Sequence, residues 1–355
     1  MVSHQRGRMS RYLATCACVL GLAAAATAEV LYVDGRLGQD NQTGTQSQPL
    51  KTLAQATQQI KESPTPGPTT IKVAPGVYSL DRSVLLENRR NYTEQDRLTI
   101  EATVVPDDPN WSLALMPVLL SVEDPRKPGD LTSRTETYSV VIRNSHVTIR
   151  GLRFLGNPLP NNWHCCISRI EKELDDLLVT QCLFLGNPAG LDIYCAALAT
   201  GDRFQVDHNV FQQCHACVVF WDGPDGMGGK QCAMRYCLVE GASLASVWTC
   251  RTQNDLEFHH NVVTGSEYFW MRRAGDSIRY RLRDCVVTDT RRYSAYGEES
   301  GASGPTGPEV TYEEHSVIQQ GRVILETDKR SRNYLHIVPG TLGSDLGAGL
   351  FRPKP

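Results

Sequence analysis

One repeating column of residues runs through the middle of the chain and limits the folds it can adopt. The segment VTIRGLRFLGN (147–157) aligns with LLVTQCLFLGN (177–187) at an offset of 30 residues, and the register continues at steps of 24 to 30. Columns two residues after the centre of the repeat, and three and five before it, hold no charged residue in seven repeats. The central column consists of Leu152, Cys182, Asn209, Cys237, Asn261, Cys285 and His315.

A unit of this length, with short period-2 strands and no helical pattern, is typical of one coil of a parallel β-helix. Successive coils stack about 4.8 Å apart, so equivalent side chains form ladders along the interior. We therefore expect an all-β, single-stranded, right-handed parallel β-helix of about ten coils, in which residues 139–325 form the regular coils. Asn209 and Asn261 are expected to bond the turn of the next coil through their side-chain amides.

The stretch QVDHNVFQQCHAC (205–217) looks like a metal or redox motif, but the repeat gives it another interpretation. His208 and His260 fall in one outer column two coils apart, about 9–10 Å, too far to share one ion. That Cys214, His215 and Cys217 bind a metal ion remains a minor alternative hypothesis.

The cysteines of the repeat are expected to be mostly free. Cys182, Cys237 and Cys285 lie two coils from one another, beyond the Cα separation of about 7 Å that a disulfide allows, so we predict buried thiols. Cys166 and Cys195 fall at equivalent places in adjacent coils, where one disulfide between coils is an open alternative.

The N-terminus predicts export. Residues 1–28 combine three arginines, an apolar core and the small residues Ala26-Thr27-Ala28, as a signal peptide does. A secreted or periplasmic domain of residues 29–355 would follow, and no later stretch is long and apolar enough for a membrane span. A net charge of −3 gives no electrostatic reason to expect a nucleic-acid partner.

The segment before the repeats predicts a cap for the open end of the solenoid. Residues 49–63 place Leu50, Leu53, Ala54, Ala56 and Ile60 on roughly one face of an amphipathic helix, followed by a strand in TIKVAPGVYSL (70–80). A Tyr-Val-Asp strand, Gly38-Gln39-Asp40, a Gly-Thr pair, a Pro-Leu-Lys-Thr helix start and a Pro-Gly-Val-Tyr strand occur in this order.

This order resembles the N-terminal signature of exported bacterial β-helix proteins of the pectate-lyase-like class. Residues 334–355 look like the closing segment of these proteins. The resemblance implies the fold and leaves the function open, because the class mixes lyases, hydrolases and proteins without known activity.

A second column follows the ladder and offers candidate substrate-binding residues. It contains Trp163, Tyr194, Trp221, Trp248, Trp270 and Tyr296, with charged residues beside several of the rings. One interpretation is an aromatic stack that faces the core. The other is an exposed groove in which ring faces pack on sugars and charged groups bind hydroxyls and carboxylates.

Two enzymatic versions follow from the groove. In a glycoside hydrolase, Asp192 and Asp222 from adjacent coils would act as the carboxylate pair. In an acidic-polysaccharide lyase, Arg251, Arg272 or Arg273 would act on a uronate, with His164 or His260 assisting. The lyase is slightly ahead, and a non-catalytic adhesion or scaffold protein is the competing class.

The expected partner is a polysaccharide or oligosaccharide, and we expect a monomer. The sequence implies no cofactor, since an Asp cluster that would bind calcium is missing. A calcium requirement is therefore a question for experiment.

Overall fold

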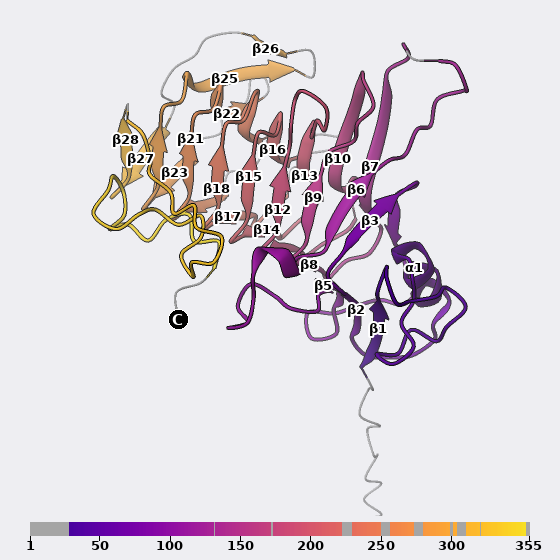
Figure 1. Ribbon diagram of the computed structural model, residues 1–355. Helices are drawn as coiled ribbons and strands as arrows, with labels where there is room; N and C mark the ends of the chain where they lie inside the picture. Colours follow the sequence, from indigo (N-terminus) through magenta and orange to yellow (C-terminus); the bar gives the residue numbers. More distant parts are fainter. Residues whose placement is uncertain are drawn as a thin grey trace, which may run out of the picture.

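The computed structural model describes residues 28–130, 132–171, 173–221, 229–249, 256–272, 280–298, 301–303, 310–319 and 321–352. Side chains are also left undescribed at 280–281, 294–298, 301–303, 310–314 and 319. Residues 1–27 of the predicted signal peptide lie outside this part. Within it, the chain winds around one axis, and strands of similar direction follow one another from indigo to orange (Figure 1).

Most coils contribute one strand to each of three sheets of parallel strands, which we number 1 to 3 in the order in which the chain visits them. The strands of sheet 1 are β1 Glu29–Val33, β2 Thr69–Val73, β5 Leu98–Ala102, β8 Val147–Arg150, β11 Leu177–Thr180, β14 Phe204–Asp207, β17 Ala233–Arg235, β20 Glu257–His259, β23 Tyr280–Arg283 and β27 Val310–Glu314. Those of sheet 2 are β3 Val77–Leu80, β6 Val118–Ser121, β9 Arg153–Leu155, β12 Leu183–Leu185, β15 Val210–Gln212, β18 Leu238–Glu240, β21 Val262–Thr264, β24 Val286–Thr288 and β28 Val317–Gln319.

Sheet 3 carries the candidate site on its outer side. Its strands are β4 Val84–Leu86, β7 Thr135–Ile142, β10 Asn162–Arg169, β13 Cys195–Ala199, β16 Ala216–Phe220, β19 Ala245–Thr249, β22 Tyr268–Arg272, β25 Arg292–Glu298 and the antiparallel β26 Gly301–Ser303. With ten strands in sheet 1, the predicted right-handed parallel β-helix of about ten coils is confirmed. Regular pairing begins before residue 139, because β5, β6 and β7 already form a coil.

The central column is an inward ladder, as predicted. Asn209 Oδ1 accepts a hydrogen bond from the Cys182 backbone N–H at 2.9 Å, and Asn209 Nδ2 donates to the Val179 carbonyl at 2.8 Å. Asn261 bonds Cys237 and Met234 in the same way. The amides therefore bind the turn of the preceding coil, the opposite direction to the one expected.

The last coil departs from the predicted register by one residue. Ser316 Oγ, rather than His315, accepts the hydrogen bond from the Cys285 backbone N–H, at 3.1 Å. Val287 pairs with Ile318, not with Val317. The cause is an extra residue in β27, where the register shifts after Tyr280, and such a bulge moves every later position by one.

Just before the ladder, the chain turns through a left-handed residue whose side chain faces outward. His208, Tyr236 and His260 occupy this place in successive coils, with φ between 53° and 54°. Tyr236 stacks on His208 at a centroid distance of 4.8 Å and packs at a tilt of 32° against His260 at 4.7 Å. The predicted separation of the two histidines by two coils is confirmed. In the described part, no group of three or more His, Cys, Asp or Glu side chains is placed to hold a metal ion.

The N-terminal motifs form the cap. Helix α1 spans Leu53–Glu62, and Thr52 Oγ1 caps it by accepting the Gln55 N–H. The Asp40 carboxylate accepts the backbone N–H groups of Lys51 and Thr52 at 3.0 and 2.9 Å. A Cβ on Gly38 would lie 2.1 Å from the Leu50 carbonyl oxygen, so the turn requires glycine there. The motif order is thus a set of contacts that fix the helix on the first coil.

The C-terminal segment covers the outer face of sheet 2. Residues 321–352 run alongside the solenoid (yellow in Figure 1). Phe351 is fully buried and makes an edge contact with Trp111 at 5.7 Å. Together with Tyr334, Leu335 and Ile337, it packs on the outward side chains Leu183, Val210, Leu238, Val262 and Val286. A helix Leu113–Leu115 (η1) also lies in this layer.

The described cysteines are free thiols, which confirms the expectation for Cys182, Cys237 and Cys285. The alternative of a disulfide between Cys166 and Cys195 is wrong, because both are free thiols. Cys195 pairs in register with Cys165 and lies on the outer face of sheet 3, whereas Cys166 is buried in the core. In the described part, no helix is long and apolar enough to cross a membrane.

Candidate functional site

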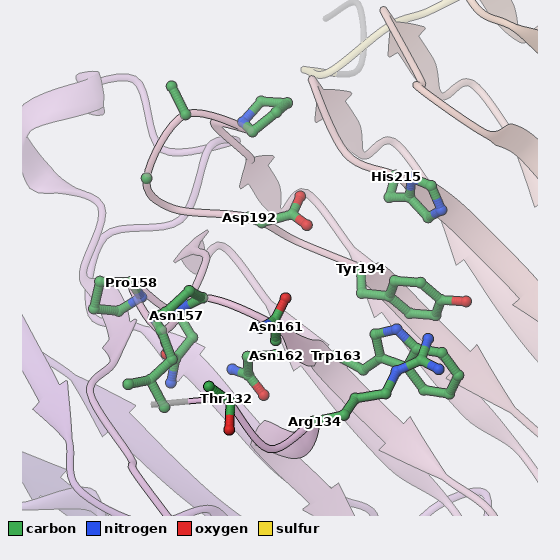
Figure 2. Close-up of a pocket in the computed structure, with 15 residues that line it drawn as sticks. Thr132, Arg134, Asn157, Pro158, Asn161, Asn162, Trp163, Asp192, Tyr194 and His215 are labelled. Atoms are coloured by element: carbon green, nitrogen blue, oxygen red, sulfur yellow. The ribbon is translucent and has the colours of Figure 1, made fainter. Parts of the chain in front are cut away.

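A pocket of about 790 Å³ opens where the chain enters strands β10, β13 and β16. Its walls come from the loops that precede these strands and from the segment before β7 (Figure 2). The residues that line it are Thr132, Arg134, Asn157, Pro158, Leu159, Pro160, Asn161, Asn162, Trp163, Pro188, Ala189, Gly190, Asp192, Tyr194 and His215.

The repeated Phe-Leu-Gly-Asn sequence builds two walls of this pocket. A Cβ on Gly156 would lie 2.2 Å from the Leu191 carbonyl oxygen and 2.3 Å from that of Asp192, so glycine lets the two loops touch. Asn157 Oδ1 accepts the Leu159 N–H, and Asn187 Oδ1 accepts the Ala189 N–H, at 2.9 and 3.0 Å. The turn at Asn157 therefore recurs one coil later at Asn187, and the loop that follows it places Asp192 at the pocket.

Four planar groups form a continuous stack along one side of the pocket. The Arg134 guanidinium lies 3.0 Å above the centroid of the Trp163 ring. Trp163 stacks on Tyr194 at 4.8 Å and Tyr194 on His215 at 5.0 Å, with interplanar angles of 16° and 26°. Each coil supplies one ring, because the coil spacing matches the stacking distance.

This stack changes the predicted mode of sugar binding. Both faces of Trp163 are covered, one by Arg134 and the other by Tyr194. Tyr194 is likewise enclosed between Trp163 and His215. The rings therefore offer edges and polar groups to a ligand, whereas the groove interpretation of the sequence had open ring faces pack on sugars.

Asp192 and His215 are the titratable pair of the pocket. Burial raises the pKa of the Asp192 carboxyl, and His215 opposes this shift. Burial lowers the pKa of His215, and Asp192 opposes that shift in turn. His215 Nδ1 lies 3.0 Å from Ser243 Oγ. At neutral pH the imidazole is therefore in its neutral, basic form, with Nε2 as the nitrogen that Ser243 does not engage.

The predicted catalytic residues do not come together. Asp192 lines the pocket. His164 is fully buried inside the solenoid, where Nδ1 lies 2.9 Å from Thr137 Oγ1 and Nε2 3.1 Å from Ser139 Oγ. Arg272 is also buried. Both point to the core because neighbouring residues of a strand face opposite sides. Arg251, Arg273 and Asp222 lie outside the described residues.

The outer face of sheet 3 explains why the aromatic residues do not form one column. Along each strand the side chains point out, in, in, out and in, as in Ala245 to Thr249. Trp248 takes the second outward place and pairs with Met271, while Trp270 pairs with Val247 on the inside. A shift of one residue changes the face.

Four members of the predicted column share the outer face of sheet 3, and Trp270 does not. Trp163 and Tyr194 line the pocket, and with Trp221 and Trp248 they also line an adjoining groove of about 150 Å³ on sheet 3. Trp270 Nε1 donates to Thr249 Oγ1 at 2.9 Å within the core. Tyr296 pairs with Arg272 by its backbone, and its side chain is not described.

The sequence reasoning missed Arg134, Asn161 and His215 as pocket residues. His215 was considered there only as part of a metal motif, and Arg134 lies before the regular repeats. The signal that could have found the pocket was the repeated Phe-Leu-Gly-Asn, because its two copies place the loops 157–161 and 187–192 side by side.

With three parallel sheets wound around one axis and an N-terminal helix over the first coil, the chain folds as a parallel β-helix. Residues 36–83, which include α1 and most of the motifs around it, match a family described as a protein of unknown function, DUF1565.

Solved structures show distant likenesses. A rhamnogalacturonan lyase is 12% identical over 76% of this chain and 70% of that chain, with a TM-score of 0.44. The GH136 lacto-N-biosidase from Eubacterium ramulus, as the native protein, is 11% identical over 87% and 68%, with a TM-score of 0.29. No curated protein matches the sequence. These comparisons assign neither a reaction nor a substrate to this chain.

Proposed function

We propose that the protein binds an acidic oligosaccharide or polysaccharide in the pocket and cleaves it by β-elimination. The observation that carries the proposal is that Arg134, Asp192 and His215 line one pocket together with the Trp163–Tyr194 stack. A cation, a neutral imidazole and aromatic edges are the groups that a uronate and its hydroxyls would need.

Arg134 would bind the uronate carboxylate. Its guanidinium can donate two parallel hydrogen bonds to a carboxylate, and its position over the Trp163 ring holds the fork in place. Bound in this way, the positive charge lowers the energy of the enolate that forms when the proton next to the carboxylate leaves. Arg134 would thus bind the substrate and stabilise the intermediate.

His215 would be the base. Its lowered pKa keeps Nε2 unprotonated near pH 7, and Ser243 fixes the ring through Nδ1. The proton taken from the carbon next to the carboxylate ends on the leaving glycosidic oxygen, and a carbon–carbon double bond forms in the uronate. Asp192 would support the imidazolium during the transfer, since the two groups interact electrostatically.

The hydrolase alternative is weaker in the described part of the pocket. Both retaining and inverting hydrolases need two carboxyl groups. Among the described residues that line the pocket, Asp192 is the one carboxylate. The second candidate is therefore a non-catalytic binding protein. The stack of Trp163, Tyr194 and His215 favours it, because stacked rings stabilise neighbouring coils whether or not the protein is an enzyme.

The test is the ultraviolet absorbance of unsaturated uronate products when the purified protein meets a panel of acidic polysaccharides, with calcium and with a chelator. His215→Ala should lower the rate roughly 10²–10⁴-fold. The matched control is His315→Ala, a histidine whose side chain is 74% exposed and does not line the pocket. Arg134→Lys should raise KM, because lysine keeps the charge and loses the fork.

Absence of the product, together with binding that Arg134→Ala weakens, would leave the non-catalytic binding protein as the better account. Absence of binding as well would overturn the proposal. A calcium requirement would appear as loss of activity in the chelator arm.

A further inference from the structure

Two cysteines lie opposite each other on the outer face of sheet 3, beside the pocket. Strands β10 and β13 pair Cys165 directly with Cys195. Both belong to the apolar layer outside the solenoid, with Ala216 next in the row. Neighbouring parallel strands are about 4.8 Å apart, and disulfides join Cα atoms about 4.4–6.8 Å apart. The backbone therefore already holds this pair at bonding distance.

Exposure distinguishes the two thiols from the others. Of the described cysteines, Cys165 is the one that is partly exposed, and the rest are buried. Both Cys165 and Cys195 line the groove of about 150 Å³ that adjoins the pocket. A dissolved reagent can thus reach Cys165 first. Cys195 is buried beside it on the neighbouring strand.

The chemistry of the pair assigns the order of reaction. Burial raises the pKa of the Cys195 thiol well above its ordinary value, and the neighbouring Cys165 raises it further. The thiolate is the reactive form of cysteine, so the buried member is a slow nucleophile on its own. Its suitable role is to resolve a bond that the more exposed cysteine has made.

We propose that Cys165 and Cys195 are a reversible dithiol–disulfide site that small-molecule disulfides oxidise. The Cys165 thiolate attacks one sulfur of the oxidised reagent and releases the first reagent thiolate. The Cys195 thiolate then attacks the Cys165 sulfur and releases the second. The two released thiolates take up the two protons that the cysteines lose. The protein gives up two electrons, and the disulfide reagent is reduced to two thiols.

The position of this bond connects it to the pocket. Trp163 precedes Cys165 by two residues, and Tyr194 precedes Cys195 by one. The disulfide would therefore join the two coils directly below the Trp163–Tyr194 stack. This inference does not depend on the proposed reaction, because it concerns the register of β10 and β13 alone.

The experiment equilibrates the purified protein with glutathione and glutathione disulfide at several ratios. Free thiols are then trapped with a maleimide, counted by mass spectrometry and mapped by peptide analysis. We expect the loss of two thiols per chain, one peptide pair linked through Cys165 and Cys195, and full reversal by a reductant. The melting temperature should rise by roughly 5 °C on oxidation, because the link closes a loop between coils.

Cys165→Ser and Cys195→Ser should each abolish the linked peptide and the shift in melting temperature. Cys166→Ala is the matched control, since this neighbour points into the core and should leave both effects intact. Circular dichroism checks that each variant folds. No loss of thiols in glutathione disulfide, or linkage of any other cysteine pair, would overturn the proposal.

Discussion

The outer faces of sheets 2 and 3 are built alike but are used differently. Both present apolar side chains to the outside in every coil of the middle region. On sheet 2 the C-terminal segment covers them, and Val210, Val262 and Val286 are completely buried. On sheet 3 a groove remains along Cys165, Leu198 and Trp221, which are partly exposed.

The outer face of sheet 2 therefore serves the stability of the fold, whereas the outer face of sheet 3 is available to a ligand. An apolar face covered by the chain itself contributes to stability in proportion to its buried area. An apolar face next to a polar pocket is where proteins bind molecules. Changes on sheet 2 should therefore alter stability, whereas changes around the pocket on sheet 3 should alter binding.

The largest expected effect is on sheet 2. Phe351→Ala removes a fully buried ring and its contact with Trp111, and should lower the free energy of unfolding by about 3–5 kcal/mol. Ile170→Ala on the groove of sheet 3, where the side chain is 55% exposed, should change it by less than about 0.5 kcal/mol. Urea denaturation measures both. Equal losses would remove the distinction between the two faces.

The next effect depends on pH and concerns the inner side of sheet 3. Burial lowers the pKa of His164 to about 4, and the hydrogen bond with Thr137 opposes this. In the unfolded chain the His164 imidazole takes up a proton near pH 6.5, whereas in the folded chain it does so only near pH 4. Stability is therefore complete above pH 6.5 and falls between pH 6.5 and 4, by about 3 kcal/mol from this group.

His164→Asn should flatten that dependence in denaturation curves recorded from pH 7 to pH 4. The variant will also be less stable at pH 7, because it changes a buried site, so the slope is the relevant measurement. An unchanged slope would show that His164 does not carry the effect.

A smaller effect should come from the close approach of the C-terminal segment to sheet 2. Gly349 has φ +64°, and a Cβ there would lie 2.6 Å from Val262 Cγ2. Gly349→Ala should cost about 2–3 kcal/mol from strain and contact together. Gly347 has a similar φ of +62° with nothing within 4 Å, so Gly347→Ala should show the strain alone, about 1 kcal/mol. Thermal melts compare the two, and equal losses would contradict the close contact.

The last prediction concerns ligand binding at the pocket. Trp163→Ala removes the group between Arg134 and Tyr194 and should weaken binding of an acidic oligosaccharide about tenfold. Trp221→Ala is the control, since Trp221 lines the groove but not the pocket. Calorimetric titration measures both. If Trp221→Ala weakened binding more than Trp163→Ala, the ligand would belong to the groove.

The fold could be predicted because its ladder obeys a short-range rule. Asn209 and Asn261 recur where the chain must bond the neighbouring coil, and the buried columns alternate regularly with charged residues. The predicted register was wrong by one residue at Ser316, because the hydrophobic pattern does not reveal the extra residue in β27.

The site was harder to predict, because it depends on side-chain direction after turns of unequal length. Counting from the ladder placed Trp248 and Trp270 in one column, although they face opposite sides of sheet 3. Asp192 was found because it lies in the loop itself. His215 and Arg134 were missed because their contact with Tyr194 and Trp163 is a property of stacked coils and not of either local sequence.

The closing segment has a consequence for how the molecule forms. Arg352 Nε donates to the Pro106 carbonyl at 2.7 Å, a contact between residues 246 positions apart. A solenoid held by nearest neighbours can grow coil by coil and fray from its ends. Here Arg352 is hydrogen-bonded to the loop that follows β5, so the closing segment joins coils that are far apart in the sequence. Non-local contacts of this kind slow folding, because the loop between the two partners must close before the contact can form.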